Sequence, residues 1–159
     1  MPRFDSLTTS SGAPVTPADV AADLNQYAQQ ASAVMAAPLV VGLGATVPIV
    51  CNAEVTDPEG NYDAATGSYT VPSDGDYAVE LDTVGPAATA FEIDVTVDGV
   101  PTGLYSQSVD QINGLASRNE TRALLPLTAG QVIGFQTTDT VGGGFTLSSA
   151  RVVVAKVGG

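Results

Sequence analysis

The chain of 159 residues contains no histidine and only one cysteine, Cys51. The lack of histidine excludes Ser-His-Asp and Cys-His catalysis, and a single cysteine excludes an intramolecular disulfide or a zinc finger. Carboxylates alone would have to carry any catalysis, and no two acids are marked as the pair that a glycosidase uses. Cys51 directly follows the mostly apolar residues 47–50, which predicts a buried structural thiol. We therefore expect no enzyme, no cofactor and no metal site.

Basic residues and long apolar runs are also scarce. Seventeen acids against five bases give a net charge of −12, and a chain of this charge repels phosphate backbones, so no nucleic-acid partner is expected. No stretch of 18 apolar residues predicts a membrane span. The polar residues 1–10 show no apolar core of a secretory signal, so we expect none. Hydrophobic residues make up 44% of the chain, a share that is typical of a globular protein.

Composition and periodicity divide the chain into four segments. Residues 1–15 are rich in polar and turn-forming side chains. They predict either a disordered leader or an extended anchoring arm that becomes ordered against another subunit, and we favour the arm. Residues 16–37 predict a helix, and residues 38–45 predict a linker. Residues 46–159 carry strand patterns separated by turn residues, which predict a mainly β head built as an antiparallel jelly-roll sandwich.

The helix prediction depends on end signals and on a seven-residue period. Thr16, Pro17 and Asp19 match an N-terminal cap, and Pro38 would end the helix. Apolar residues recur at alternating steps of four and three, the spacing of a coiled-coil seam: Val20, Leu24, Tyr27, Ala31 and Val34. We expect these five to trimerise the chain. The alternative is an amphipathic helix that lies on its own domain.

Two runs in the head alternate between apolar and polar residues. The pattern is unbroken over residues 91–98, and in residues 76–82 the apolar Tyr77, Val79 and Leu81 alternate with Asp76, Glu80 and Asp82 except at Ala78. Glu92, Asp94 and Thr96 are therefore expected to face water while their neighbours enter the core. Residues 151–157 are apolar on both faces. A strand of this kind is either central in a sheet or covers a subunit contact.

Residues 52–77 resemble the signature of the complement C1q and tumour necrosis factor-like domain. The resemblance is carried by a Tyr-Asp before Thr-Gly, an aromatic-Thr-Val-Pro, and a Gly two residues before an aromatic. The residues are Tyr62, Asp63, Thr66, Gly67, Tyr69, Val71, Pro72, Gly75 and Tyr77. The segments 97–100 and 125–132 are similar to later parts of the same domain. The resemblance implies a ten-stranded jelly roll in two sheets, a compact homotrimer, and a binding role without catalysis.

One loop offers two interpretations. Asp57, Glu59, Asn61 and Asp63 stand at every second position, a spacing at which oxygen ligands can hold calcium. The later glutamate of an EF-hand loop is missing, and Asp, Asn and Gly are ordinary turn residues. We favour the structural interpretation of this loop.

A trimeric head on a short coiled coil, preceded by an N-terminal arm, predicts a structural protein of a bacteriophage virion. Arginine outnumbers lysine four to one, which suggests a GC-rich coding sequence, and residues 4–17 resemble the leaders of small virion proteins. The expected role is a minor tail or fibre protein, or a capsid fibre or decoration protein, that assembles in the host cytoplasm. The arm and helix would bind other virion proteins, and the head would project, with host-surface glycan as a candidate ligand. The alternative is a free soluble C1q-like module that binds glycan or protein outside any virion.

Overall fold

The computed structural model describes residues 30–86, 90–107 and 117–158. These residues form thirteen strands and no helix. The strands are β1 (Gln30–Val34), β2 (Leu39–Val41), β3 (Thr46–Pro48), β4 (Ala53–Thr56), β5 (Tyr62–Asp63), β6 (Ser68–Thr70), β7 (Gly75–Gly85), β8 (Phe91–Val97), β9 (Val100–Gln107), β10 (Ser117–Leu127), β11 (Val132–Asp139), β12 (Phe145–Leu147) and β13 (Ser149–Gly158). The described part of the chain contains no helix that is long and apolar enough to cross a membrane.

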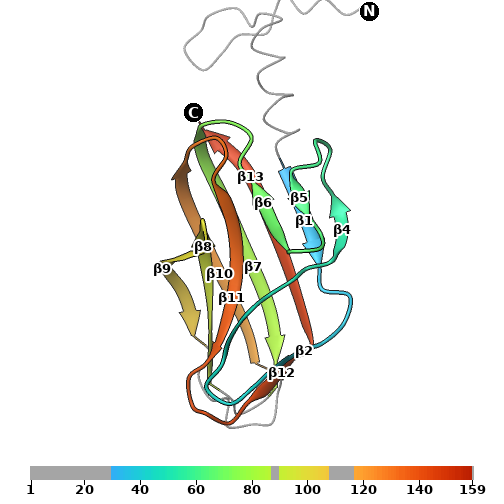
Figure 1. The fold of residues 1–159 in the computed structure, drawn as a ribbon, viewed down its shortest axis with the longest axis vertical. Coiled ribbons are helices and arrows are strands. Elements are labelled where there is room, and N and C mark those ends of the chain that lie inside the picture. Colours follow the sequence, from blue (N-terminus) through green and yellow to red (C-terminus); the bar gives the residue numbers. More distant parts are fainter. Residues whose placement is uncertain (1–29, 87–89, 108–116, 159) are drawn as a thin grey trace, which may run out of the picture.

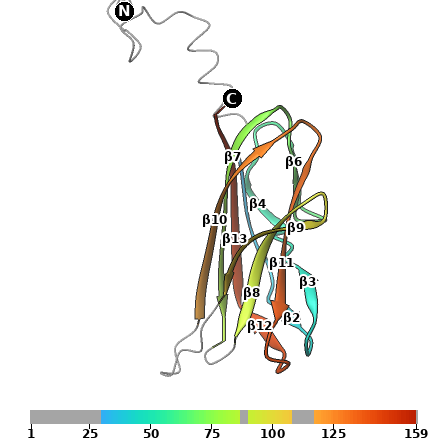
Figure 2. The same ribbon diagram turned by 90° about the vertical axis from the view of Figure 1, so that its left-hand side faces the viewer.

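The strands form a sandwich of two antiparallel sheets. One sheet has the order β10-β7-β13-β1-β4, and the other has the order β5-β6-β11-β8-β9 with β3 also paired to β11. Figure 2 shows the two layers edge-on, with β10, β7 and β13 on one side and β8, β11 and β3 on the other. A short sheet of β12 and β2 lies at one end of the sandwich (Figure 1).

The core fills the space between the two sheets and follows the predicted alternation. Along β7, Tyr77, Val79 and Leu81 are at most 1% exposed, and Phe91, Ile93 and Val95 of β8 are equally buried. Removing such side chains from water contributes about 1.5–3 kcal/mol each. The mainly β class and the jelly-roll sandwich predicted from the sequence are therefore confirmed over the described residues.

The outward side of β8 differs from the prediction. Asp94 and Thr96 were expected to face water, yet they are only 6% and 7% exposed. Side chains of the two flanking strands border this side: the Thr102 hydroxyl on β9 lies 3.5 Å from the Asp94 carboxylate, and Gln136 on β11 is the register partner of Asp94. Burial raises the pKa of Asp94 above its usual value. Period-two alternation assigns the face of a residue, but neighbouring strands decide whether that face is exposed.

The predicted helix is wrong over its last part, because residues 30–34 form strand β1. This strand pairs with β13 on one side and with β4 on the other. Without β1, the apolar strand β13 would present an unpaired edge, and covering that edge satisfies a row of backbone hydrogen bonds. The helix propensity of Ala31 and Ala33 is weaker than this gain, and both side chains enter the core. Residues 16–29 lie outside the described residues.

The linker predicted for residues 38–45 is also wrong in part. Strand β2 pairs with β12, and Val41 on this strand is 1% exposed. The head therefore includes residues 30–41, ahead of the predicted start at residue 46. For residues 151–157 the sequence offered two alternatives, a central strand or a strand that covers a subunit contact. The first is confirmed, since β13 is a central strand between β7 and β1.

Candidate functional site

The first signature residues build the β5–β6 hairpin. The Asp63 carboxylate accepts hydrogen bonds from the Ala65 N–H and the Thr66 hydroxyl, both at 2.9 Å, and these bonds lower its pKa. Gly67 closes the turn with a φ of +71°. A Cβ atom at Gly67 would lie 2.8 Å from the Val50 Cα, so only glycine fits against this neighbouring segment.

The signature tyrosines hold buried backbone groups. The Tyr62 hydroxyl donates to the Cys51 carbonyl at 2.8 Å, and the Tyr77 hydroxyl donates to the Ser73 carbonyl at 2.8 Å. Tyr69 is fully buried, and its ring centroid lies 6.3 Å from that of Tyr77. Val71 is equally buried, and Pro72 and Gly75 lie at the entry to β7. The signature tyrosines therefore stabilise the fold.

Cys51 is the buried thiol that the sequence predicts. The residue is 1% exposed, and burial raises the pKa of its thiol to about 11. Thiolate is the reactive form of cysteine, so at neutral pH this side chain behaves as a small apolar residue.

The acids of the loop at residues 57–63 contact their own loop and the hairpin. The Asp57 carboxylate accepts the Tyr62 N–H at 2.7 Å, and Glu59 lies 3.5 Å from the Asn61 amide. Asp63 serves the β5–β6 turn. Within the described ranges, no group of three acids, cysteines or histidines could hold a metal ion. These contacts give Asp57 and Asp63 roles in the loop and its turn, as the structural interpretation expects.

The structure describes two of the five predicted seam residues, Ala31 and Val34, and both lie on strand β1. Ala31 is 1% exposed and packs inside its own sandwich, so it cannot join a seam between subunits. Val34 lies at the end of β1, half-buried, with its register partner Arg151 on β13. Val20, Leu24 and Tyr27 lie outside the described residues, and their role in trimerisation stays a prediction.

A second candidate for subunit contact is the side of the five-stranded sheet that points away from the core. We name this surface the outer face. Its side chains alternate with the core residues of β1, β7, β10 and β13: Ser32, Val34, Ala78, Glu80, Asp82, Val84, Arg118, Glu120, Arg122, Leu124, Arg151, Val153 and Ala155. Three of the five bases of the chain lie here, although they form no run in the sequence.

The outer face has a charged region and an apolar region. In the charged region, Arg118 pairs with Asp82, and Arg122 pairs with Glu120 and lies 3.7 Å from Glu80. In the apolar region, one row across the sheet joins Ala155, Ala78 and Leu124. Leu124 is 63% exposed at the edge strand β10. An exposed leucine beside small apolar residues, bordered by mixed charges, is the composition of a protein–protein contact.

At the end of the sandwich that carries β2 and β12 (Figure 1), one carboxylate holds two loops together. Asp139 accepts the Gly44 and Gly144 N–H groups at 2.9 Å, and those of Val141 and Gly142 at 3.2 and 3.1 Å. Four such bonds favour the ionised form and lower the pKa of Asp139. We name residues 42–45 and 140–144 the distal loops.

The comparisons with known proteins bear on the fold. No protein-family model matches the sequence, and no curated protein matches it either. Among solved structures, the globular domain of the zebrafish complement 1qA protein has a TM-score of 0.61 at 13% identity, over 79% of this chain and 94% of that chain. The Eiger TNF of S. frugiperda has a TM-score of 0.61 at 16% identity, over 80% and 91%.

A third similar structure is murine APRIL, with a TM-score of 0.59 at 11% identity, over 79% of this chain and 97% of that chain. Identities this low show a shared fold and carry no ligand or partner from one protein to the other. The described part of the chain thus has the jelly-roll fold of the complement C1q and tumour necrosis factor-like domains.

Proposed function

We propose that this chain is a non-enzymatic structural protein of a bacteriophage virion that assembles as a homotrimer. Its N-terminal segment binds other virion proteins, and its jelly-roll head projects as part of a minor tail or fibre protein, or of a capsid fibre or decoration protein. The head binds a ligand at the host surface. The observation that carries the homotrimer is the outer face of the five-stranded sheet, and the resemblance to C1q-like domains supports a threefold assembly. The virion role rests on the arm, the helix and the leader resemblance that the sequence predicts.

The outer face suits contact between identical subunits. Its central side chains, Ala78 and Ala155, are small, so another protein surface can approach the sheet closely. Acids and bases are interspersed on the same face, and a symmetric contact between copies can therefore match opposite charges without excess charge of one sign. Covering Leu124 removes apolar surface from water, which favours association.

The positions of the strand ends support attachment at one end of the head. The start of β1 lies beside the end of β13, since Gln30 pairs with Ala155. The distal loops lie at the opposite end of the sandwich (Figure 1). A head attached through the segment that precedes β1 therefore presents its distal loops and its sheet faces away from the attachment point.

The trimer is tested by the solution mass of the full chain, measured by light scattering after size exclusion. We expect three times the protomer mass of 16.0 kDa. Leu124→Asp places a charge on the outer face and is expected to shift the mass toward the monomer, because burying an unpaired carboxylate is costly. Val100→Asp is the control, since Val100 is similarly exposed, 67%, but lies on the other sheet. Equal masses for both variants and the parent would show that the outer face is not the contact.

The attachment role is tested by truncation of the arm. Deleting residues 1–15 is expected to leave a folded oligomer that no longer joins phage particles, as measured by immunoblot of purified virions. The first described strand begins at Gln30, so this deletion spares every described strand. Normal incorporation of the truncated chain would contradict attachment through the arm. If the full chain is absent from virions as well, the free binding module becomes the better description.

A further inference from the structure

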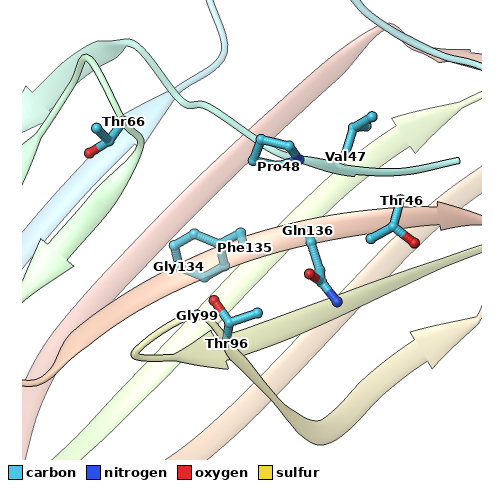
Figure 3. Close-up of a pocket in the computed structure, with 9 residues that line it drawn as sticks. All are labelled: Thr46, Val47, Pro48, Thr66, Thr96, Gly99, Gly134, Phe135 and Gln136. Atoms are coloured by element: carbon cyan, nitrogen blue, oxygen red, sulfur yellow. The ribbon is translucent and has the colours of Figure 1, made fainter.

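A cavity of about 240 Å³ opens on the side of the second sheet that points away from the core. It lies where β3 runs beside β11 and where the β8–β9 turn approaches the same strand (Figure 3). Nine residues line it: Thr46, Val47, Pro48, Thr66, Thr96, Gly99, Gly134, Phe135 and Gln136.

The floor of the cavity exists because residue 134 is a glycine. A Cβ atom at Gly134 would lie 2.8 Å from the Thr96 hydroxyl oxygen, closer than side-chain atoms normally approach. Gly99, on the turn that borders the cavity, has a φ of +77°, a conformation that glycine adopts without strain. The backbone is therefore accessible at the place where most residues would fill the space with a side chain.

The lining carries no charge, although the chain contains 17 acids and five bases. A phosphate or carboxylate ligand would find no cation here, and a cation would find no carboxylate. The lining instead supplies hydroxyl groups and one amide beside apolar surface from Val47, Pro48 and Phe135. This chemistry selects a neutral ligand that has both hydroxyl groups and C–H surface.

Two polar groups in the lining have unused hydrogen-bonding capacity. Thr46 and Thr66 already bond within the protein, to Thr138 at 2.8 Å and to Asp63 at 2.9 Å. Over the part of the chain that the structure describes, the Thr96 hydroxyl has no hydrogen-bond partner, although the residue is only 7% exposed.

The Gln136 amide, on the neighbouring strand, likewise has no partner among the described residues. Figure 3 shows both side chains in the space between β11 and the β8–β9 hairpin. Neither group is among the fully buried, unpartnered polar atoms of the described residues, so both are reachable from the cavity and can exchange a water for a ligand hydroxyl.

We propose that this cavity binds one neutral pyranose unit of a glycan, with Thr96 and Gln136 as its hydrogen-bonding residues. The inference rests on the proposed function, since it supplies the ligand site of the projecting head. The volume is below the roughly 300–1,000 Å³ of drug-sized sites, so it accommodates one small unit rather than a chain. The open side lets the rest of the glycan extend into solvent. A homotrimer repeats the site three times, which converts weak single-site binding into avidity for a glycan-coated surface.

The experiment is an amide chemical-shift titration of the full chain. The probes are the methyl glycosides of glucose, galactose, mannose and N-acetylglucosamine, with methyl glucuronide as the charged counterpart. We expect at least one neutral glycoside to give saturable shifts in residues 46–48, 96–99 and 134–136, with a Kd on the order of 1 mM. No saturable shift with any neutral glycoside, shifts that map elsewhere, or an equal response to the glucuronide would overturn the proposal.

Variants assign the binding to the cavity. Thr96→Val and Gln136→Ala each remove a hydrogen-bonding group, and Gly134→Ala fills the floor. Each is expected to weaken binding of the responding glycoside at least tenfold. Gly143→Ala is the matched control for Gly134→Ala, because a Cβ atom at Gly143 meets nothing within 4 Å and lies in a distal loop. Unchanged affinity in Thr96→Val and Gln136→Ala would overturn the assignment. The trimer mass and particle incorporation are independent of this result, so failure here is distinguishable from failure of the proposed function.

Discussion

Gly67→Ala is expected to lower the free energy of unfolding by about 2–5 kcal/mol, one of the largest effects of any single change in the head. About 1–2 kcal/mol comes from placing a side chain at a positive φ, here +71°. The rest comes from overpacking, which typically costs about 1–3 kcal/mol. The added methyl would lie 2.8 Å from the Val50 Cα and 3.0 Å from the Ile49 carbonyl oxygen, and backbone cannot rotate away as a side chain can. Chemical denaturation at a fixed protein concentration measures the change.

Gly60→Ala separates the two contributions. Gly60 has nearly the same φ, +70°, but nothing lies within 4 Å of its added Cβ atom. We expect Gly60→Ala to cost only the conformational part, about 1–2 kcal/mol. If both variants lose the same stability, the close approach of the β5–β6 turn to residues 49–51 contributes nothing, and the Thr-Gly of the signature serves the turn alone.

The strands that the sequence predicts well are those with long, regular alternation. Tyr77, Val79 and Leu81 on β7, and Phe91 and Ile93 on β8, enter the core as expected. The pattern succeeds because each of these strands has one face against the opposite sheet along its whole length. The signature block succeeded for a related reason, since its Tyr-Asp and Thr-Gly are required by a local turn that the sequence alone specifies.

The segment at residues 30–34 shows where periodicity fails. Ala31 and Val34 fit a heptad seam, while Ala31 and Ala33 fit the period of two of a strand, and five residues are too few to decide between these periods. The deciding partner is β13, more than a hundred residues later in the sequence. A single sequence does not state which edge of a sheet will be left uncovered, so local propensity was the only available guide, and it pointed to a helix.

The outer face and the cavity could not be predicted, because each depends on which residues of neighbouring strands lie opposite one another. Arg118 and Arg122 lie on one face of β10, but their approach to Asp82 and Glu80 depends on the pairing of β10 with β7. The same holds for Gly134 and Thr96, which are register partners on β11 and β8. The one available signal was the spacing of four between the two arginines, which places both on the same side of any strand.

Asp139→Asn is expected to loosen the distal loops and to lower the melting temperature by several degrees at neutral pH. The carboxylate accepts four backbone N–H groups, from Gly44, Val141, Gly142 and Gly144. An asparagine of the same size has one acceptor oxygen, and its NH₂ group faces donors that it cannot satisfy. Thermal unfolding measures the loss, and amide hydrogen exchange is expected to accelerate at these four residues.

The pH dependence of this loss identifies its cause. Because the folded-state pKa of Asp139 is lowered from 3.8, its contribution is complete above pH 3.8 and is lost as the pH falls through the lower folded value. The difference in melting temperature between the parent and Asp139→Asn is therefore expected to shrink as the solution is acidified below pH 3.8.

Glu59→Gln is the control, at an exposed acid whose side chain lies 3.5 Å from the Asn61 amide. This variant is expected to show neither the loss of melting temperature nor its pH dependence. If the difference between the parent and Asp139→Asn stays constant down to the lowest pH at which the parent folds, the charge of Asp139 does not hold the distal loops. Their order would then come from packing around Val41 and Phe145, the register partners of β2 and β12.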